Sequence, residues 1–178
     1  MTLPERFLPR YSYRDYEAWE GRWELIRGIP FAMSPSPNLR HQKINTKLAW
    51  CFTESLQQFS NCIPVIPVDY RLDDHTILQP DLLVISDEAD GQYLDDTPEL
   101  VVEILSPSTA DNDRELKYQL YQEEGVPYYL IVDPVTETIE VFHHQGTYEL
   151  VATLHTESPA FEFRTRLCTF SVDFSKIW

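Results

Sequence analysis

Apolar residues gather in short segments that predict a β-sheet in the middle of the chain. Residues 62–72 alternate between apolar and polar positions and are rich in β-branched side chains, and residues 77–85 form another strand candidate. Residues 100–105 are almost wholly apolar. A strand that is apolar on both faces is typical of a sheet covered on both sides, so the pattern favours an α/β protein. Three more strands are expected at residues 128–133, 138–143 and 148–154.

A helical period of apolar positions predicts one long helix on each side of these strands. The first covers residues 41–58 and follows Asn38, which is a suitable N-cap residue. The second covers residues 111–124 and ends before Gly125, a suitable residue just beyond a helix end.

The N-terminal region predicts a short helix followed by a hairpin. Residues 14–19 carry aromatic side chains at three- and four-residue spacing, which favours a helix whose rings face the core. Residues 23–27 and 29–33 read as two strands around Gly28, because glycine tolerates the backbone of a tight turn. We therefore expect a single α/β domain over residues 1–178, with a central mixed β-sheet flanked by helices.

The charge of the chain restricts how it can bind a partner. The 178 residues suit one well-buried domain, and a hydrophobic fraction of 43% is that of an ordinary globular protein. The formal net charge is -15, from 14 Lys and Arg against 29 Asp and Glu. This balance argues against binding nucleic acid by bulk electrostatics. Any nucleic-acid function therefore needs a local basic patch and a metal that neutralises the acids.

The sequence carries no signal of a membrane or secreted protein. No apolar run approaches the ~20 residues of a membrane span, and residues 1–6 lack the layout of a signal peptide, so we expect a cytoplasmic protein. The three cysteines are widely spaced and form no metal-binding motif. We expect Cys51, Cys62 and Cys168 to be buried free thiols rather than a disulfide or a zinc site.

Two acidic residues stand beside or inside apolar strands. Asp81 follows Pro80 at the head of one strand candidate, and Glu103 lies among Val and Ile residues in another. A carboxylate in a low-dielectric interior shifts its pKa, pairs or binds a cation. If the two strands pair, both acids reach one end of the sheet and can share a divalent metal such as Mg²⁺.

A lysine follows on the next helix. Asp113, Lys117 and Tyr121 recur every four residues and therefore lie on one helical face. If that face packs beside Glu103, the ammonium group reaches the acids. Two acids for a metal and one cation for the phosphate are the groups that metal-dependent phosphodiester hydrolysis requires.

The order of these residues resembles a known nuclease signature. Pro80-Asp81, followed 22 positions later by Glu103 in Val-Glu-Ile-Leu, resembles the PD-(D/E)XK motif. Over roughly residues 10–155 the chain is also similar to the "Uma-two" family of restriction-endonuclease-like proteins. The phrases that carry this resemblance are residues 23–28, residues 33–37 with His41 after them, and residues 103–109, 113–117 and 129–134.

The resemblance implies a restriction-endonuclease-like fold that binds Mg²⁺, or Mn²⁺, and hydrolyses DNA. Asp81, Glu103 and the backbone carbonyl of Ile104 would be the metal ligands. The usual motif has its lysine two residues after the second acid, where this chain has Leu105. The family is taken to use a lysine relocated to the next helix, which corresponds to Lys117.

The resemblance also assigns supporting roles and a homodimeric state. Glu24 matches the acidic position of the family's N-terminal element and would bind a second metal or a metal-bound water. Gln119 and Tyr121 would lie behind the ligands. Apart from the resemblance, His41 stands at a helix start, where a histidine is usually a cap or surface residue, but it could contact phosphate or transfer a proton. On the first long helix, the best local basic cluster shares one helical side, which is more often a solvated face than a nucleic-acid patch, and its members are the candidate phosphate contacts: Arg40, Lys43 and Lys47.

Simpler interpretations stand beside each of these assignments. Asp81 alone would be a turn or cap residue, Lys117 a solvated helix residue, and Glu24 either a surface acid or a ligand. The main alternative for the whole chain is a non-catalytic nuclease-like module that binds a protein or nucleic acid, which the net charge of -15 favours. A glycosidase-like pair of carboxylates fits worse because it leaves Lys117 without a role.

Overall fold

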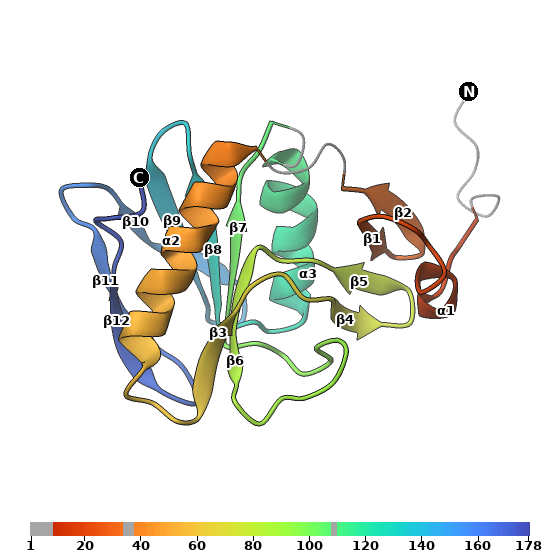
Figure 1. Cartoon of the computed structure of the whole chain (residues 1–178), viewed down its shortest axis with the longest axis horizontal. Coiled ribbons are helices and arrows are strands. Elements are labelled where there is room, and N and C mark those ends of the chain that lie inside the picture. The colour runs from red at the N-terminus through yellow and green to blue at the C-terminus, as the bar shows by residue number, and fades with distance from the viewer. Residues whose placement is uncertain (1–8, 34–37, 108–109) are drawn as a thin grey trace.

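A six-stranded sheet forms the centre of the computed structural model, which describes residues 9–33, 38–107 and 110–178 (Figure 1). The strand order is β10-β9-β8-β7-β6-β3. Strands β7 and β8 are parallel and the other neighbours are antiparallel, so the predicted mixed sheet is confirmed. The strands are β3 (Cys62–Val65), β6 (Leu82–Ser86), β7 (Leu100–Ile104), β8 (Tyr128–Asp133), β9 (Thr138–His144) and β10 (Tyr148–Leu154).

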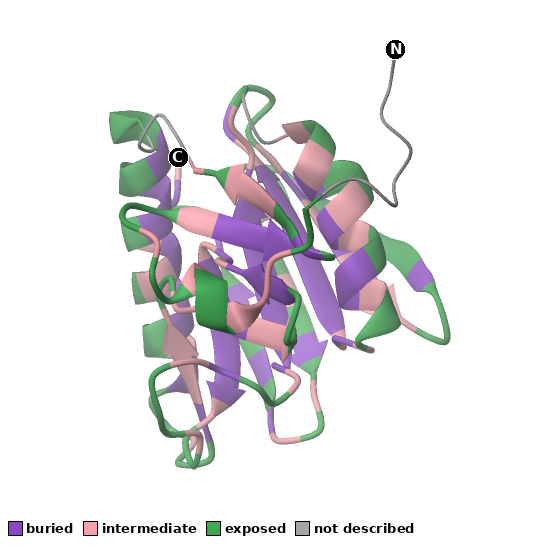
Figure 2. Cartoon of the chain, turned by 90° about the vertical axis from the view of Figure 1, so that its right-hand side faces the viewer, coloured by how far each residue is buried: buried purple, intermediate pink, exposed green. Residues whose placement is uncertain are grey.

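Helices cover both faces of this sheet, as predicted. Helix α2 (Leu39–Leu56) lies on one face and helix α3 (Tyr118–Glu123) on the other (Figure 1). Side chains of β7 alternate between two cores, so Val102 packs on the α2 side and Val101 on the α3 side. Glu103 follows the same alternation and projects toward α3. Strands β6, β7 and β8 at the centre of the sheet are buried along most of their length, whereas β10 at one edge is largely exposed (Figure 2).

The two long helices begin and end close to their predicted bounds. The side chain of Asn38 caps α2 by accepting a hydrogen bond from the His41 main chain at 3.0 Å. The second helix opens with a π-helical turn, η2 (Asn112–Lys117), which continues directly into α3. Such wide turns are rare and often occur at functional sites. No helix in the described part of the chain is long and apolar enough to cross a membrane.

A smaller sheet lies beside α3, on the side away from α2 (Figure 1). Its strand order is β2-β1-β5-β4, and the predicted hairpin around Gly28 forms β1 and β2. The strands are β1 (Trp23–Ile26), β2 (Ile29–Ala32), β4 (Tyr70–Asp73) and β5 (Thr76–Leu78).

Two segments predicted as single strands are each divided between the two sheets. Residues 62–72 contribute β3 to the large sheet and β4 to the small one, and residues 77–85 contribute β5 and β6 in the same way. Pro67 and Pro80 lie in the two breaks. Because proline has no N–H to donate to a strand ladder, both positions disfavour a continuous strand, and the chain crosses to the other sheet there.

The N-terminal helix is shorter and less buried than predicted. Helix α1 (Tyr13–Tyr16) is a single turn without a buried residue. Its aromatic rings pack on neighbouring rings instead of the core, with 5.7 Å between the centroids of Tyr16 and Trp19 and 5.6 Å between those of Trp19 and Trp23. A one-turn helix is too short to present a continuous apolar face, so these rings form a half-buried aromatic cluster.

A C-terminal hairpin that the sequence analysis did not predict packs on the α2 side. It consists of β11 (Ala160–Arg164) and β12 (Thr169–Asp173). Phe163 and Val172 are buried in the core that α2 shares with the large sheet. The alternation of apolar and polar residues in both strands is the signal that predicts them.

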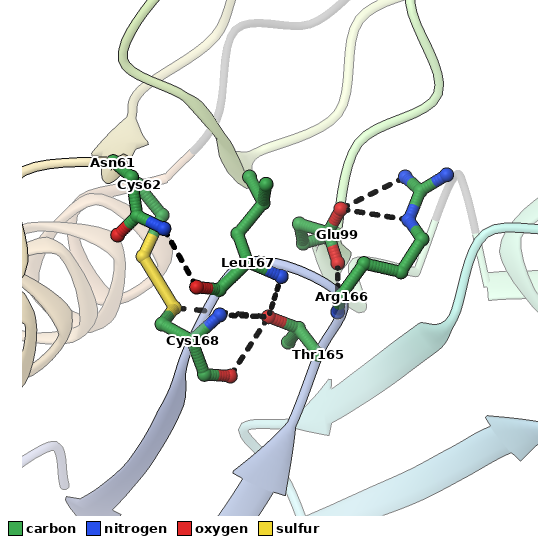
Figure 3. Close-up of a disulfide and its surroundings, with 7 residues drawn as sticks. All are labelled: Asn61, Cys62, Glu99, Thr165, Arg166, Leu167 and Cys168. Atoms are coloured by element: carbon green, nitrogen blue, oxygen red, sulfur yellow. Dashed lines mark hydrogen bonds and ion pairs between the residues drawn. A yellow bond between two sulfur atoms is a disulfide. The ribbon is translucent and has the colours of Figure 1, made fainter.

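The cysteine prediction is wrong for two of the three residues. Cys62 of β3 and Cys168, just before β12, form a disulfide that ties the edge of the large sheet to the C-terminal hairpin (Figure 3). Their separation along the chain gave no spacing signal, because the fold alone brings β3 and the hairpin together. Cys51 is a free buried thiol, as predicted.

The disulfide leads to a direct chemical test. In denaturant without reductant, the chain is expected to react with one equivalent of a thiol reagent at Cys51, and with three equivalents after reduction. A Cys51→Ser variant should show none before reduction. Three reactive thiols in the unreduced wild type would contradict the pairing.

Candidate active site

Asp81 and Glu103 lie opposite each other at one end of the large sheet. Strand β6 pairs antiparallel with β7, and Leu82 stands opposite Val102. One step further along each strand, the register places Asp81 opposite Glu103. The pairing that the sequence analysis required of these two strands is therefore present.

The Asp81 carboxylate is held by both the sheet and helix α2. Its Oδ2 accepts a hydrogen bond from the Ile104 main-chain N–H at 2.9 Å and lies 3.2 Å from Nε2 of His41. The side-chain amide of Asn45, one turn further along α2, donates to the Asp81 main-chain oxygen at 3.1 Å. Because α2 supplies both His41 and Asn45, its first turns fix the position of Asp81.

Glu103 is buried and bonded to the face of the helix that carries Lys117. Its Oε1 accepts hydrogen bonds from Lys117 Nζ at 3.0 Å and from the Tyr121 hydroxyl at 2.8 Å. The π-helical turn and the start of α3 thus bring Lys117 and Tyr121 to one carboxylate oxygen. The predicted approach of this helical face to Glu103 is present.

Lys117 joins three carboxylates from three parts of the fold. Besides Glu103, its Nζ lies 2.9 Å from Oε1 of Glu24 on β1 and 3.3 Å from Oδ1 of Asp113 on its own helix. The side chain of Lys117 is 3% exposed, which excludes the solvated position that a helix lysine usually takes. An ammonium group has three N–H donors, so these three carboxylates can occupy all of them.

Two further contacts fix the carboxylates around Lys117. The Gln79 main-chain N–H donates to Oε1 of Glu24 at 2.9 Å, and the Tyr129 hydroxyl donates to the Asp113 main-chain oxygen at 2.8 Å. The small sheet, the large sheet and the helix therefore meet at this cluster.

Burial and charge shift the pKa values of this cluster. Burial raises the pKa of Glu103 well above its usual value, and the positive charge of Lys117 opposes that rise. Burial also lowers the pKa of Lys117, but Glu103, Glu24 and Asp113 together raise it well above its usual value, so the ammonium keeps its charge. Three acids surround one cation, and the cluster therefore has a deficit of positive charge.

The ion pair with Asp81 favours the charged form of His41. Burial lowers the pKa of this imidazole, while its hydrogen bond to Asp81 and the Asp81 charge raise it, and the net direction is upward. The His41 side chain is 7% exposed, so it is a buried site residue rather than a surface residue.

The oxygen atoms of the site fit a hard divalent cation. Asp81, Glu103 and the Ile104 carbonyl provide two carboxylates and one main-chain oxygen, a set that suits Mg²⁺ because this ion takes few protein ligands and keeps several waters. The deficit of positive charge around Glu103 favours a cation as well. No group of three or more His, Cys, Asp or Glu side chains within the described ranges is arranged to hold a metal ion, so the main-chain oxygen and water matter for such a site.

Several predicted contact residues lie outside this cluster. Gln119 is exposed, because it faces away from the side of the helix that carries Lys117 and Tyr121, and its predicted position behind the ligands is wrong. On α2, Arg40 pairs with Glu137 at 2.8 Å, Lys43 is exposed, and Lys47 donates to the main-chain oxygen of Trp178. A phosphate contact by any of the three basic residues stays a prediction. Residues 34–37, which belong to one of the phrases that carry the family resemblance, lie outside the described residues.

Sequence reasoning missed several residues that position the acids. The four-residue spacing predicts that Asp113 lies on the same helical face as Lys117, but nothing in the sequence indicates that Asp113 is buried. Asn45 lies four residues after His41, and this helical spacing is the signal that places it beside Asp81. Gln79 and Tyr129 act through contacts between distant segments, for which the sequence gives no local signal.

The layered sheet and its end-of-strand acids define a protein of restriction-endonuclease-like fold. A solved structure of similar architecture is the "putative nuclease belonging to DUF820" from Anabaena variabilis, with a TM-score of 0.65. The two share 18% sequence identity, and the match covers 78% of this chain and 82% of that one.

The chain belongs to the Uma2 family, whose model matches residues 13–164 and is described as "Putative restriction endonuclease". The resemblance inferred from the sequence is thereby confirmed. An uncharacterized protein from Synechocystis sp. is 27% identical over 182 residues, which span 96% of this chain and 93% of that protein. Membership of the family places this chain among nuclease-like proteins.

Proposed function

We propose that this protein is a Mg²⁺-dependent endonuclease that hydrolyses phosphodiester bonds of DNA. The observation that carries the proposal is the cluster itself, in which Asp81 and Glu103 face each other on paired strands and Lys117 Nζ lies 3.0 Å from Glu103. A buried ionisable cluster is costly to keep, so its presence at one end of the sheet favours function over structure.

Each residue has a distinct role in this proposal. Asp81, Glu103 and the Ile104 carbonyl hold the metal, which supplies a Lewis acid and an activated water. Lys117 fixes the Glu103 carboxylate and adds positive charge near the scissile phosphate. Glu24 and Asp113 hold the ammonium in place, and Tyr121 orients Glu103 through its 2.8 Å hydrogen bond.

DNA contact would rely on a small number of basic side chains near the site. Arg40 and Lys43 lie near the start of α2, on the same helix as His41, and are exposed. Many exposed acidic side chains repel DNA: Asp73, Asp74, Asp87, Glu88, Asp90, Asp95 and Asp96. Because few phosphate contacts release few counterions, DNA binding should be weak and depend only shallowly on added salt, and cutting of both strands would use a homodimer.

The proposal is tested by pairing cleavage with metal binding in the Asp81→Asn variant. Wild type is expected to nick or cut DNA with Mg²⁺ or Mn²⁺ and to stop in EDTA, and its melting temperature should rise with added metal. Asp81→Asn keeps the side-chain shape, so its fold should persist while cleavage and the metal-induced shift are both lost. Asp87→Asn, at an exposed acid beyond β6, is the matched control and should behave as wild type.

The non-catalytic module makes the opposite prediction. If the protein is such a module, Mg²⁺ and Mn²⁺ should not shift its melting temperature, and no condition should produce cleavage. Equal metal stabilisation of wild type and Asp81→Asn would remove Asp81 from the site. The formal net charge of -15 is the observation that keeps this second function open.

A further inference from the structure

Arg114 lies over the same row of the large sheet as Lys117. Glu103 lies opposite Ile131 on β8, and Ile131 lies opposite Glu140 on β9. Cross-strand neighbours point to the same face of a sheet, so Glu103 and Glu140 both face the helix formed by η2 and α3. Lys117 binds Glu103. Arg114, three residues earlier, has its Nη1 2.6 Å from Oε2 of Glu140. One helix therefore presents two cations to two acids of a single row.

The two cations differ in the donors that they keep free for a ligand. Lys117 is 3% exposed and its three N–H donors face three carboxylates, so it has none left for a phosphate. The Arg114 side chain is 39% exposed. Within the described ranges, the one ion pair of its guanidinium is with Glu140, through a single nitrogen. Because a guanidinium carries five N–H donors, Arg114 keeps donors free at the surface.

The contact between Arg114 and Glu140 is close but poorly aligned. Oε2 of Glu140 is buried and receives no hydrogen bond from the described part of the chain, so the guanidinium lies beside it without donating to it. The pair of Arg40 and Glu137, by contrast, includes an aligned hydrogen bond of 2.8 Å. A half-exposed ion pair contributes little stability. A phosphate, whose oxygens match the guanidinium fork, can therefore replace this carboxylate.

The row of acids places Arg114 at a phosphate beside the scissile one. Strand β8 separates β7 from β9, and neighbouring strands lie about 4.8 Å apart, so Glu140 is roughly 10 Å from Glu103 across the sheet. One strand of DNA carries a phosphate about every 3.4 Å along its axis, so this span covers about three phosphates. Both η2, which leads into α3, and the start of α2 lie at this end of the sheet (Figure 1). DNA whose scissile phosphate lies near Asp81 and Glu103 would therefore also pass Arg114.

We propose that Arg114 leaves Glu140 to bind the DNA backbone beside the scissile phosphate, and that it sets how tightly the substrate is held rather than how fast the bond is cut. A guanidinium binds a phosphate with two parallel N–H bonds, which the buried ammonium of Lys117 cannot do. Glu140 keeps the guanidinium over the sheet until DNA arrives. This inference rests on the proposed function, because the phosphate that Arg114 binds belongs to the same substrate.

The test compares Arg114→Gln with wild type in DNA cleavage and in DNA binding. Glutamine keeps a polar side chain without the charge. In Mg²⁺ the variant is expected to raise the KM for a DNA duplex roughly tenfold and to change kcat less than about threefold. In EDTA, fluorescence anisotropy of a labelled duplex over a series of salt concentrations measures Kd. The slope of log Kd against log salt concentration should fall by about 0.9, the value for one lost phosphate contact.

A second arginine–glutamate pair supplies the control. Arg164 and Glu162 on β11 are exposed and 2.8 Å apart, so Arg164→Gln should keep the wild-type KM and salt slope. Glu140→Gln removes the competing carboxylate and should lower the KM, and this gain should shrink when Arg114 is replaced as well. An equal rise of the KM in Arg114→Gln and Arg164→Gln would reduce the effect to overall charge and overturn the inference.

The same measurements distinguish this inference from the function that it rests on. If wild type cleaves DNA and Arg114→Gln cleaves it with an unchanged KM and salt slope, the inference fails and the proposed function stands. If wild type binds DNA, loses affinity in Arg114→Gln as expected, and never cleaves, the endonuclease fails and the phosphate contact stands. If wild type neither binds nor cleaves DNA, both fail. Melting curves verify that every variant is folded.

Discussion

Replacing Lys117 by methionine is expected to lower the free energy of unfolding by about 3–5 kcal/mol at neutral pH. Methionine fills a similar volume without charge, so the change isolates the ammonium group. Without it, the carboxylates of Glu24, Glu103 and Asp113 remain buried and lose their shared cation, which is the costly way to break a buried ion pair. Urea denaturation of both proteins measures the difference.

The loss of stability in this variant should depend on pH. In wild type the pKa of Lys117 is higher in the folded than in the unfolded chain. The stability that Lys117 contributes is therefore fully present below its unfolded pKa, near 10.4, so this contribution is constant between pH 5 and 8. The pKa of Glu103 is raised by burial and rises further once Lys117 is gone. A group with a raised folded pKa loses stability as pH rises, so the deficit should be smaller at pH 5 than at pH 8.

An exposed lysine supplies the control. Lys43→Met, on the solvent side of α2, should change the free energy of unfolding by no more than about 0.5 kcal/mol. If Lys117→Met were as stable as wild type at both pH values, the carboxylates would not depend on the ammonium, and the charge cluster described above would be wrong.

Glu103→Gln is expected to reduce DNA cleavage by roughly 100-fold or more while the fold is retained. The amide keeps the size of the side chain and an oxygen for the Tyr121 hydroxyl, so packing survives. It removes the negative charge that offsets Lys117 and that, in the proposed function, holds the metal. The measurement is the rate of nicking of supercoiled DNA at saturating Mg²⁺, with the melting temperature recorded in parallel.

Glu99 offers a matched comparison, because it is also a buried acid in an ion pair. It is 2% exposed, lies just before β7 at the opposite end of the strand from Glu103, and pairs with Arg166 at 2.8 Å (Figure 3). Glu99→Gln should lose stability but cleave at the wild-type rate once folded. Equal loss of cleavage in both variants would mean that the rate reports folding and that Glu103 has no special role.

The sequence predicted most of the large sheet, because its central strands β6, β7 and β8 are nearly continuous apolar runs bounded by polar or turn residues. Strand β7 and both long helices were found within a few residues of their bounds. The division of residues 62–72 and 77–85 between two sheets was missed. Strand propensity is local, whereas the choice of sheet depends on which distant strand is available as a neighbour.

The acids and the lysine of the site were predicted from the sequence, but their burial was not. Asp81, Glu103 and Lys117 follow from pattern and resemblance, and the structure brings them together with Glu24 and Tyr121. The burial of Lys117 and the use of all its donors by carboxylates could not be predicted, since burial depends on how the small sheet packs on the helix. Gln119 shows the same limit. It was predicted to lie behind the ligands, but its position two residues from Lys117 on the helix turns its side chain to solvent.

The meeting of three elements at Lys117 also bears on the order in which the chain can assemble. Glu24 comes from the small sheet, Glu103 from the large sheet, and Lys117 with Asp113 from the helix between them. Contacts between such distant segments form late, because the chain must close large loops first. A partly folded chain, in which only the large sheet has formed, would hold Lys117 without Glu24. Lys117 also follows Glu24 and Glu103 in the sequence, so a chain still in synthesis carries no completed site before residue 117 has been added and its helix has docked between the two sheets.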